Sequence, residues 1–132
     1  MPQIENQKVV YPELSYRIIG ICFGIHNKLG CYCNEQQYAD ALEETLKQED
    51  VSYIRENFLP PSFKGERNRN KPDFLIDNKI IIDLKTKRAV TREDYYQMRR
   101  YLTATGMRLG VIVNFRPRFM SHKRILNSEL PY

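Results

Sequence analysis

The feature that most constrains this chain is a pair of short, apolar runs with charged residues embedded at fixed positions. Phe74–Ile76 and Ile80–Leu84 are rich in β-branched and aromatic residues and are separated by Asp77-Asn78-Lys79, which predicts a β-hairpin. Residues two apart on a strand share a face, so Asp83 and Lys85 project together. Charged groups in an otherwise buried strand usually have a partner or a function.

The hairpin register predicts a second acidic residue beside Asp83. If residues 77–79 form a three-residue connection, Ile76 faces Ile80, and counting back places Asp73 opposite Asp83. Directly opposed residues have Cβ atoms roughly 4.5–5.5 Å apart. Two carboxylates at that distance repel each other unless a cation joins them or one stays protonated. Oxygen ligands of this kind suit Mg²⁺ or Mn²⁺. A slip of one residue would remove the pairing.

Lys85 adds a cation to this predicted acidic pair. It would offset the carboxylate charge and hold or activate a water, or stabilise charge that builds on a phosphate. The alternative is that Asp73 is a turn residue and that Asp83 and Lys85 form a surface ion pair worth less than about 1 kcal/mol. Spacing alone leaves both interpretations open.

The rest of the chain predicts helices and strands around this hairpin. We expect an irregular lead-in over residues 1–13 and a single domain over 14–132, since 132 residues are enough for one core. The predicted elements are a helix from Leu14 to Leu29, a helix over 35–48 capped by Asn34, a strand over 51–57, the hairpin, a helix from the Thr91–Asp94 capping box to Thr105, and a strand over 107–115. No structure is predicted after that strand. This order indicates an α/β fold with a small mixed β-sheet flanked by helices.

Charge is distributed unevenly along the chain. Residues 1–63 hold five basic and nine acidic residues, a net charge of −4, whereas residues 64–132 hold sixteen basic and seven acidic residues, a net charge of +9. Such asymmetry favours a polyanionic partner, and a solvated basic surface is the alternative.

The chain carries no pattern of a membrane or secreted protein. It has no apolar run long enough for a transmembrane helix, and its first residues lack the layout of a signal peptide, so we expect a cytoplasmic location. Cys22, Cys31 and Cys33 cannot all pair with one another, which argues against a disulfide scaffold. A metal site that combines them with His26 is less favoured than buried or incidental thiols.

Several segments together resemble a known protein family. Pro72-Asp73, followed after nine residues by Asp83-Leu84-Lys85, resembles the signature of the PD-(D/E)XK nuclease superfamily. The segments over residues 14–30, 35–38, 96–102 and 109–115 are similar to those of its small bacterial members called the GxxExxY family. The resemblance covers roughly residues 14–127 and implies a restriction-endonuclease-like core.

The resemblance also implies roles for individual residues. Asp73, Asp83 and the Leu84 backbone carbonyl would bind Mg²⁺ or Mn²⁺, with Lys85 as the catalytic lysine. Glu35 would complete the acidic site and its metal ligands, and Gln97 would orient substrate or water. Two features depart from the family: the loop 31–34 lacks the usual glycines and prolines, and an aspartate replaces the more usual glutamate at position 83.

These observations predict a Mg²⁺-dependent nuclease that hydrolyses phosphodiester bonds in nucleic acid, with DNA favoured. The alternatives are a non-catalytic module that binds nucleic acid or a partner on the same fold, and a role within a larger complex or a mobile-element system. A homodimer is a further possibility raised by the resemblance. Tyr95, Tyr96 and Tyr101 would stack on bases or pack in the core. Candidate phosphate-binding residues are Arg67, Arg69, Lys87, Arg88, Arg92, Arg99 and Arg100.

Overall fold

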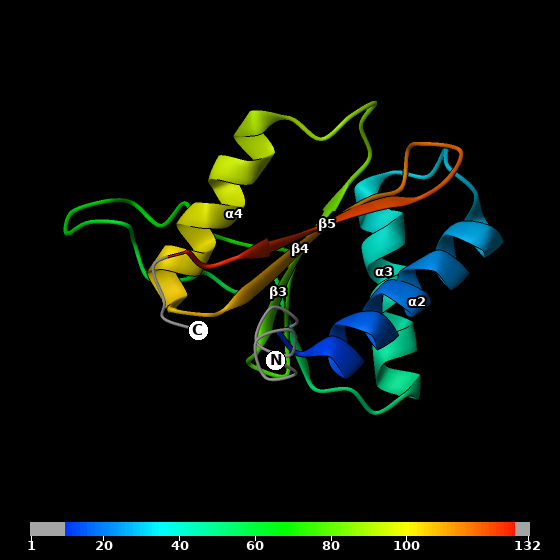
Figure 1. The fold of residues 1–132 in the computed structure, drawn as a ribbon, viewed down its shortest axis with the longest axis horizontal. Coiled ribbons are helices and arrows are strands. Elements are labelled where there is room, and N and C mark those ends of the chain that lie inside the picture. The colour runs from blue at the N-terminus through cyan, green and yellow to red at the C-terminus, as the bar shows by residue number, and fades with distance from the viewer. Residues whose placement is uncertain (1–9, 129–132) are drawn as a thin grey trace, which may run out of the picture.

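The computed structural model describes residues 10–128, which form a five-stranded β-sheet between two helical layers (Figure 1). In chain order the elements are α2 (Pro12–Leu29), α3 (Glu35–Gln48), β1 (Tyr53–Arg55), β2 (Phe74–Ile76), β3 (Ile80–Lys85), α4 (Arg92–Thr105), β4 (Leu109–Asn114) and β5 (Ser121–Leu126). The strands lie side by side in that same order, β1 to β5. Strands β3 and β4 are parallel and are joined through α4, while the other neighbours are antiparallel. The predicted α/β class with a small mixed sheet is confirmed.

Helices α2 and α3 cover one face of the sheet. Asn34 caps α3 as predicted: its side chain accepts a hydrogen bond from the Gln37 N–H, and the Gln37 side chain accepts one from the Asn34 N–H, both at 2.9 Å. This capping box satisfies two backbone donors at the start of α3. Tyr38 and Leu42, one helical turn apart, are fully buried and pack in the core beneath the sheet.

Helix α4 covers the opposite face. It begins at the predicted capping box, where Asp94 accepts a hydrogen bond from the Thr91 N–H at 2.7 Å, and it ends at Gly106 with a φ of 69°. Met98 is fully buried in a second core on this face, and Gly110 of β4 leaves the space that the Met98 side chain fills. The fold therefore has two cores, one on each side of the sheet.

Three predicted features differ in the structure. Helix α2 begins at Pro12, inside the irregular lead-in expected over residues 1–13, of which residues 1–9 lie outside the described part of the chain. The strand expected over 51–57 is limited to Tyr53–Arg55, because the Val51 N–H still bonds to Leu46 of the preceding helix and Glu56 has a φ of 54°. Strand β5 was not predicted. Its sequence is mostly polar, and Ile125 is the one strand residue that is buried, because β5 lies at the edge of the sheet.

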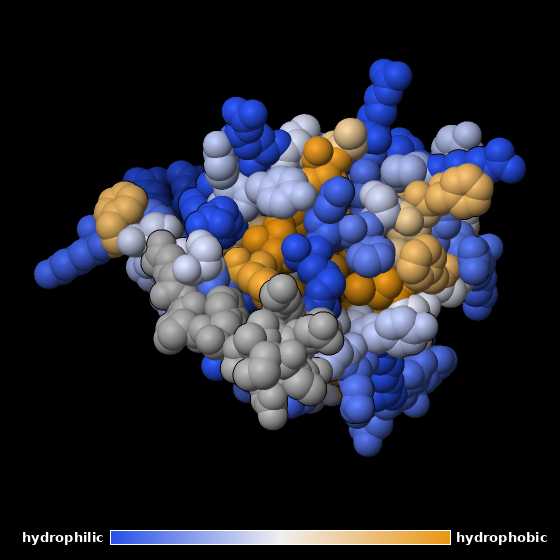
Figure 2. All heavy atoms as spheres, in the orientation of Figure 1, coloured by the Kyte–Doolittle hydropathy of each residue, from blue (hydrophilic) through white to orange (hydrophobic). Residues whose placement is uncertain are grey.

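The surface is consistent with this layered arrangement. Figure 2 shows hydrophilic side chains over the outer surfaces of the helices and hydrophobic ones in the middle of the face, where the sheet lies between the helical layers. No helix within residues 10–128 is long and apolar enough to span a bilayer.

Candidate active site

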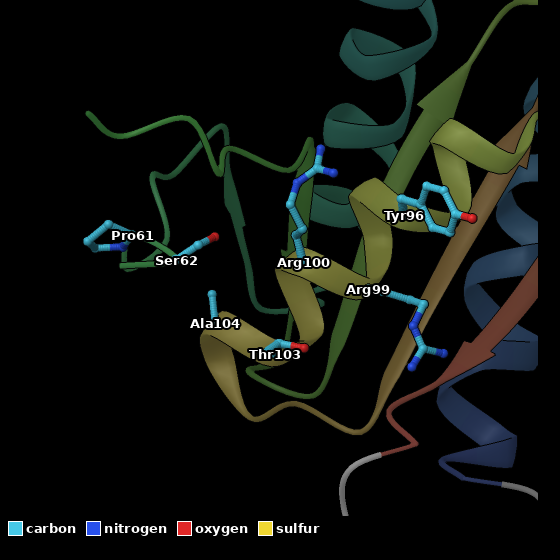
Figure 3. A pocket seen from close by; sticks show the side chains of 7 residues that line it. All are labelled: Pro61, Ser62, Tyr96, Arg99, Arg100, Thr103 and Ala104. Atoms are coloured by element: carbon cyan, nitrogen blue, oxygen red, sulfur yellow. The ribbon is translucent and has the colours of Figure 1, made fainter. Parts of the chain in front are cut away.

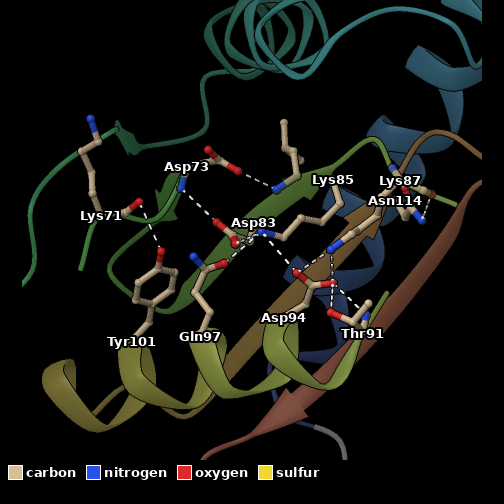
Figure 4. Close-up of polar contacts among 11 residues, drawn as sticks. Lys71, Asp73, Asp83, Lys85, Lys87, Thr91, Asp94, Gln97, Tyr101 and Asn114 are labelled. Atoms are coloured by element: carbon tan, nitrogen blue, oxygen red, sulfur yellow. Dashed lines mark hydrogen bonds and ion pairs between the residues drawn. The ribbon is translucent and has the colours of Figure 1, made fainter. Parts of the chain in front are cut away.

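The hairpin places Asp73 beside Asp83. Its register pairs Ile76 with Ile80 and Phe74 with Ile82, as predicted, so Asp73 stands one residue before β2 and opposite Asp83. The Asp73 N–H lies 3.4 Å from Asp83 Oδ1 (Figure 4). The two carboxyl groups are therefore held together by the pairing of the strands and not by a flexible turn.

Backbone hydrogen bonding fixes the orientation of the Asp73 carboxyl group. The Leu84 N–H donates to Asp73 Oδ2 at 2.6 Å. The N–H and C=O groups of one strand residue point to the same side, so the Leu84 carbonyl also faces the side on which Asp73 lies. This geometry places a backbone oxygen and two carboxylates at the same edge of β3.

The Lys85 side chain, at the end of β3, makes polar contacts with α4. Its Nζ lies 3.1 Å from Asp83 Oδ2 and donates a hydrogen bond to Gln97 Oε1 at 2.9 Å (Figure 4). Asp94 Oδ1 lies 3.8 Å from the same nitrogen. Asp94 and Gln97 are three residues apart on α4 and so share a face, which explains how one helix supplies both contacts to the lysine.

Burial and mutual repulsion shape the titration of the acidic pair. Asp83 is 4% exposed, and this burial raises its pKa although the Lys85 ammonium opposes the effect. Burial and the Asp83 charge together raise the pKa of Asp73 to about 7, against an ordinary value of 3.8. Buried Asp83 and partly exposed Asp73 thus share one neighbouring lysine, and two carboxylates this close repel each other.

Lys85 is held in its protonated form. Its burial favours the neutral amine, but Asp83, Asp94 and Glu35 outweigh this and raise the pKa of Lys85 above its ordinary value. A lysine in this state is a fixed positive charge and hydrogen-bond donor, not a base. Of the roles considered from the sequence, stabilisation of phosphate charge is the one this environment favours.

Asp94 links the site to a second cluster, which sequence reasoning did not assign to the site. Lys87 Nζ donates to both Asp94 oxygens at 2.9 and 3.1 Å, and the Thr91 hydroxyl donates to the same carboxylate. Burial favours the neutral acid, but the hydrogen bonds from Thr91 and Lys87 outweigh it and lower the pKa of Asp94. The capping box was visible in the sequence, and the three-residue spacing from Asp94 to Gln97 was the signal that could have placed Asp94 near Lys85.

Asn114 and Tyr101 complete the surroundings of the site. The Asn114 amide donates to the Lys87 carbonyl at 2.7 Å and its oxygen accepts from the Lys87 N–H at 3.1 Å, which fixes the chain leaving β3. Tyr101 is 3% exposed, and its hydroxyl donates to the Lys71 carbonyl at 3.4 Å. Burial and the charges of Asp83 and Asp73 raise its pKa. Tyr101 is therefore the core member of the three predicted tyrosines.

Two other candidates lie apart from the acidic pair. Glu35 is exposed in the first turn of α3, and its charge contributes to the raised pKa of Lys85. Among residues 10–128, no three His, Cys, Asp or Glu side chains converge closely enough to hold a metal ion, so Glu35 does not join the Asp73–Asp83 pair directly. His26 packs in the fold: its Nε2 lies 3.0 Å from the Pro117 carbonyl oxygen, and its ring stacks near Phe115.

The predicted phosphate-binding residues fall into two groups. Arg67 and Arg69 lie exposed on the loop before β2. The other five lie on α4 or on the segment that leads into it: Lys87, Arg88, Arg92, Arg99 and Arg100. Lys87 is engaged with Asp94, and Arg99 donates to Ser128 Oγ at 2.6 Å, so these two carry structural contacts as well.

The residues present fit a divalent cation. Asp73, Asp83 and the Leu84 carbonyl are hard oxygen donors at one place, the chemistry that Mg²⁺ and Mn²⁺ prefer, and few protein ligands are needed because Mg²⁺ keeps several waters. Burial raises the pKa of both aspartates, and the charge of Asp83 raises that of Asp73 further, so the protein alone does not fully stabilise the two charged carboxylates. A cation at this position would relieve that repulsion.

Comparisons with known proteins agree with this arrangement. One match is an alkaline exonuclease from Laribacter hongkongensis, with a TM-score of 0.51, 15% sequence identity and coverage of 71% of this chain. The chain spans 55% of that structure, and the likeness shows a shared restriction-endonuclease-like fold. No curated protein matches this sequence significantly. The family match runs over residues 12–125, from the first turn of α2 into β5 and through both halves of the Asp73–Lys85 hairpin, so the chain belongs to the PD-(D/E)XK nuclease superfamily.

Proposed function

We propose that this protein is a metal-dependent nuclease that hydrolyses phosphodiester bonds in nucleic acid, with DNA as the favoured substrate. The observation that carries the proposal is the pair formed by buried Asp83 and partly exposed Asp73 on opposed strands, with Lys85 Nζ 3.1 Å from Asp83. A structural ion pair would need one carboxylate and one lysine. The second carboxylate, Asp73, adds repulsion that a structural ion pair does not require.

In this proposal Asp73, Asp83 and the Leu84 carbonyl hold Mg²⁺ or Mn²⁺. The bound ion would polarise the phosphate and lower the pKa of a bound water. Protonated Lys85 donates to a non-bridging phosphate oxygen and stabilises the charge that develops as water attacks phosphorus and the P–O bond breaks. Gln97 keeps the Lys85 ammonium oriented through its 2.9 Å hydrogen bond. The attacking water gives up a proton to solvent, and the leaving oxygen takes one from solvent.

Glu35 contributes to the acidic site from the start of α3 in the same proposal. Tyr38, one turn further along α3, donates its hydroxyl hydrogen to the Gly30 carbonyl and accepts from the Cys33 N–H, so it anchors the loop that leads into the helix. This gives the Glu35-x-x-Tyr38 element a physical meaning: the tyrosine fixes the loop and thereby the position of the glutamate. It supports a place for the chain among GxxExxY proteins. A cytoplasmic location and a homodimer stay predictions.

The experiment combines substrates, metals and variants. Linear duplex DNA, circular single-stranded DNA and RNA are incubated with Mg²⁺, Mn²⁺ or EDTA, using wild-type protein, Lys85→Ala and Asp83→Asn. Metal-dependent cutting that both substitutions abolish is the expected result. Salt-sensitive binding without cutting in all three proteins would instead favour the non-catalytic binding module. Asp50→Asn, at an exposed position after α3, serves as the matched aspartate control.

A further inference from the structure

A basic groove lies beside the proposed site, between α4 and the loop before β2. We call residues 58–71 the arm; it projects beside α4 as the green segment in Figure 1. The arm contributes Pro61 and Ser62 to one wall of a groove of about 560 Å³. The opposite wall comes from α4, and Figure 3 shows the residues that line both walls, among them Tyr96, Arg99, Arg100 and Thr103.

The base of the arm is fixed. The Leu59 N–H donates to the Asn70 carbonyl at 2.7 Å, and the Asn70 side-chain amide donates to Pro60 O and Ser62 Oγ, both at 3.2 Å. Asn70 is 3% exposed, so these bonds are shielded from water. The wall formed by Pro61 and Ser62 is therefore held at a defined place relative to the body of the protein.

The groove and the proposed site share the same helix. Tyr96 lines the groove and directly precedes Gln97, which contacts Lys85. Arg100 also lines the groove and directly precedes Tyr101, which lies near the acidic pair. Tyr101 also donates to the carbonyl of Lys71, at the end of the arm and two residues before Asp73. A chain that lies in the groove would thus be led toward the acidic pair.

The lining of the groove matches a single strand of nucleic acid. Tyr96 is 48% exposed and offers a ring face, and two arginines lie three and four residues further along the helix. Aromatic stacking combined with a positively charged groove is the pattern by which proteins bind single strands. A duplex keeps its bases stacked inside, so it offers Tyr96 no base to stack on. Asp83, at 4% exposure, is also recessed from the surface on which a rigid duplex would rest.

We propose that a single strand of nucleic acid, and not a duplex, occupies the groove between the arm and α4, with a base on Tyr96 and phosphates on Arg99 and Arg100. This inference rests on the proposed function and names the substrate class of the same site. Arg67 and Arg69, exposed on the arm, extend the basic surface beyond the groove.

The test measures binding in EDTA, so that it does not depend on cleavage. Fluorescence anisotropy compares wild-type protein with Tyr96→Ala, Arg100→Ala and Arg100→Glu, using a labelled short single-stranded DNA, an RNA of the same sequence and the corresponding blunt duplex. The matched controls are Tyr16→Ala and Lys28→Ala, exposed positions on α2 across the sheet.

We expect at least one single strand to bind about tenfold more tightly than the duplex. Tyr96→Ala and Arg100→Ala are each expected to weaken single-strand binding about tenfold, with a larger loss for Arg100→Glu and unchanged binding for both α2 controls. Equal or tighter duplex binding, no binding at all, or groove variants that bind like wild type would overturn the inference. Groove-dependent binding by a protein that cuts nothing would overturn the proposed nuclease and leave this inference standing.

Discussion

Replacing Asp73 with asparagine should stabilise the metal-free protein, although Asp73 is a proposed metal ligand. Burial and the neighbouring Asp83 raise the pKa of Asp73 from 3.8 to about 7, so the folded state disfavours the charged carboxylate. An asparagine side chain has the shape of the protonated acid. Its oxygen can accept from the Leu84 N–H, and the bond from the backbone N–H of residue 73 to Asp83 does not involve the side chain, so Asp73→Asn removes the charge and keeps both contacts.

The magnitude follows from the shift in pKa. Between about pH 4 and pH 7, the folded protein keeps a proton on Asp73 that the unfolded chain has already lost. The stability of wild-type protein therefore falls as pH rises through this range and is constant above it. Each unit of pKa difference is worth about 1.4 kcal/mol, which gives roughly 4 kcal/mol at pH 8 for the full shift. Since Asp73 is partly exposed to water, we expect an advantage of about 2–4 kcal/mol for Asp73→Asn at that pH.

The assay is urea unfolding in EDTA at several values between about pH 5 and pH 8. The advantage of Asp73→Asn should grow with pH and then level off, whereas the exposed control Asp50→Asn should show no such growth. Added Mg²⁺ should stabilise wild-type protein at pH 8 and have little effect on Asp73→Asn. The electrostatic reasoning would be refuted if Asp73→Asn were no more stable than wild type at pH 8. It would also be refuted if the stability difference between the two proteins were the same at every pH.

Three further predictions follow from the site and the cores. Lys85→Met should lower the rate of cleavage by about 10²–10³-fold, because it removes the fixed charge beside the acidic pair. Its affinity for a single strand in EDTA should stay within a few-fold of the wild-type value. Unaltered cleavage would exclude the proposed role of Lys85. Asp94→Asn should destabilise the fold by about 1–3 kcal/mol at pH 7, as it weakens the bonds from Lys87 and Thr91. Because the folded pKa of Asp94 is lowered, this cost should shrink as pH falls below about 4, which urea unfolding at pH 7 and in acid would test. Gly110→Ala should lower the free energy of unfolding by about 1–3 kcal/mol, since the new Cβ would overlap Met98 Sδ. In thermal unfolding, Met98→Ala should partly restore the stability of this variant. The absence of any rescue would contradict the overpacking.

Local sequence signals predicted the parts of the fold that depend on local interactions. The three-residue connection over 77–79 fixed the hairpin register, and with it the neighbouring positions of Asp73 and Asp83, because strand pairing has a period of two residues. The cap at Thr91–Asp94 placed the start of α4 correctly. Strand β5 escaped prediction because an edge strand that is mostly polar lacks the apolar alternation on which such predictions rest.

The contacts between elements needed the structure. The three-residue spacing places Asp94 and Gln97 on one face of α4, but that this face meets Lys85 depends on how α4 packs across β3. The groove is a similar case: Arg100 was a candidate for phosphate binding, but its place opposite Pro61 depends on the path of the arm. The place of Glu35 relative to the acidic pair was equally inaccessible, because α3 packs on the other face of the sheet.

The rigidity of the hairpin bears on the two interpretations of Asp83 and Lys85. Strand β3 is held from both faces, by Ile82 in the core beneath α2 and α3 and by Ile81 in the core beneath α4. Repulsion between Asp73 and Asp83 therefore cannot be relieved by a small movement of the strand, as it could be in a surface turn. A surface ion pair would also be solvated, whereas Asp83 is 4% exposed and the Lys85 side chain 16% exposed. An acidic pair kept together against its own repulsion is expected where a cation or a phosphate-bound metal completes the charge balance.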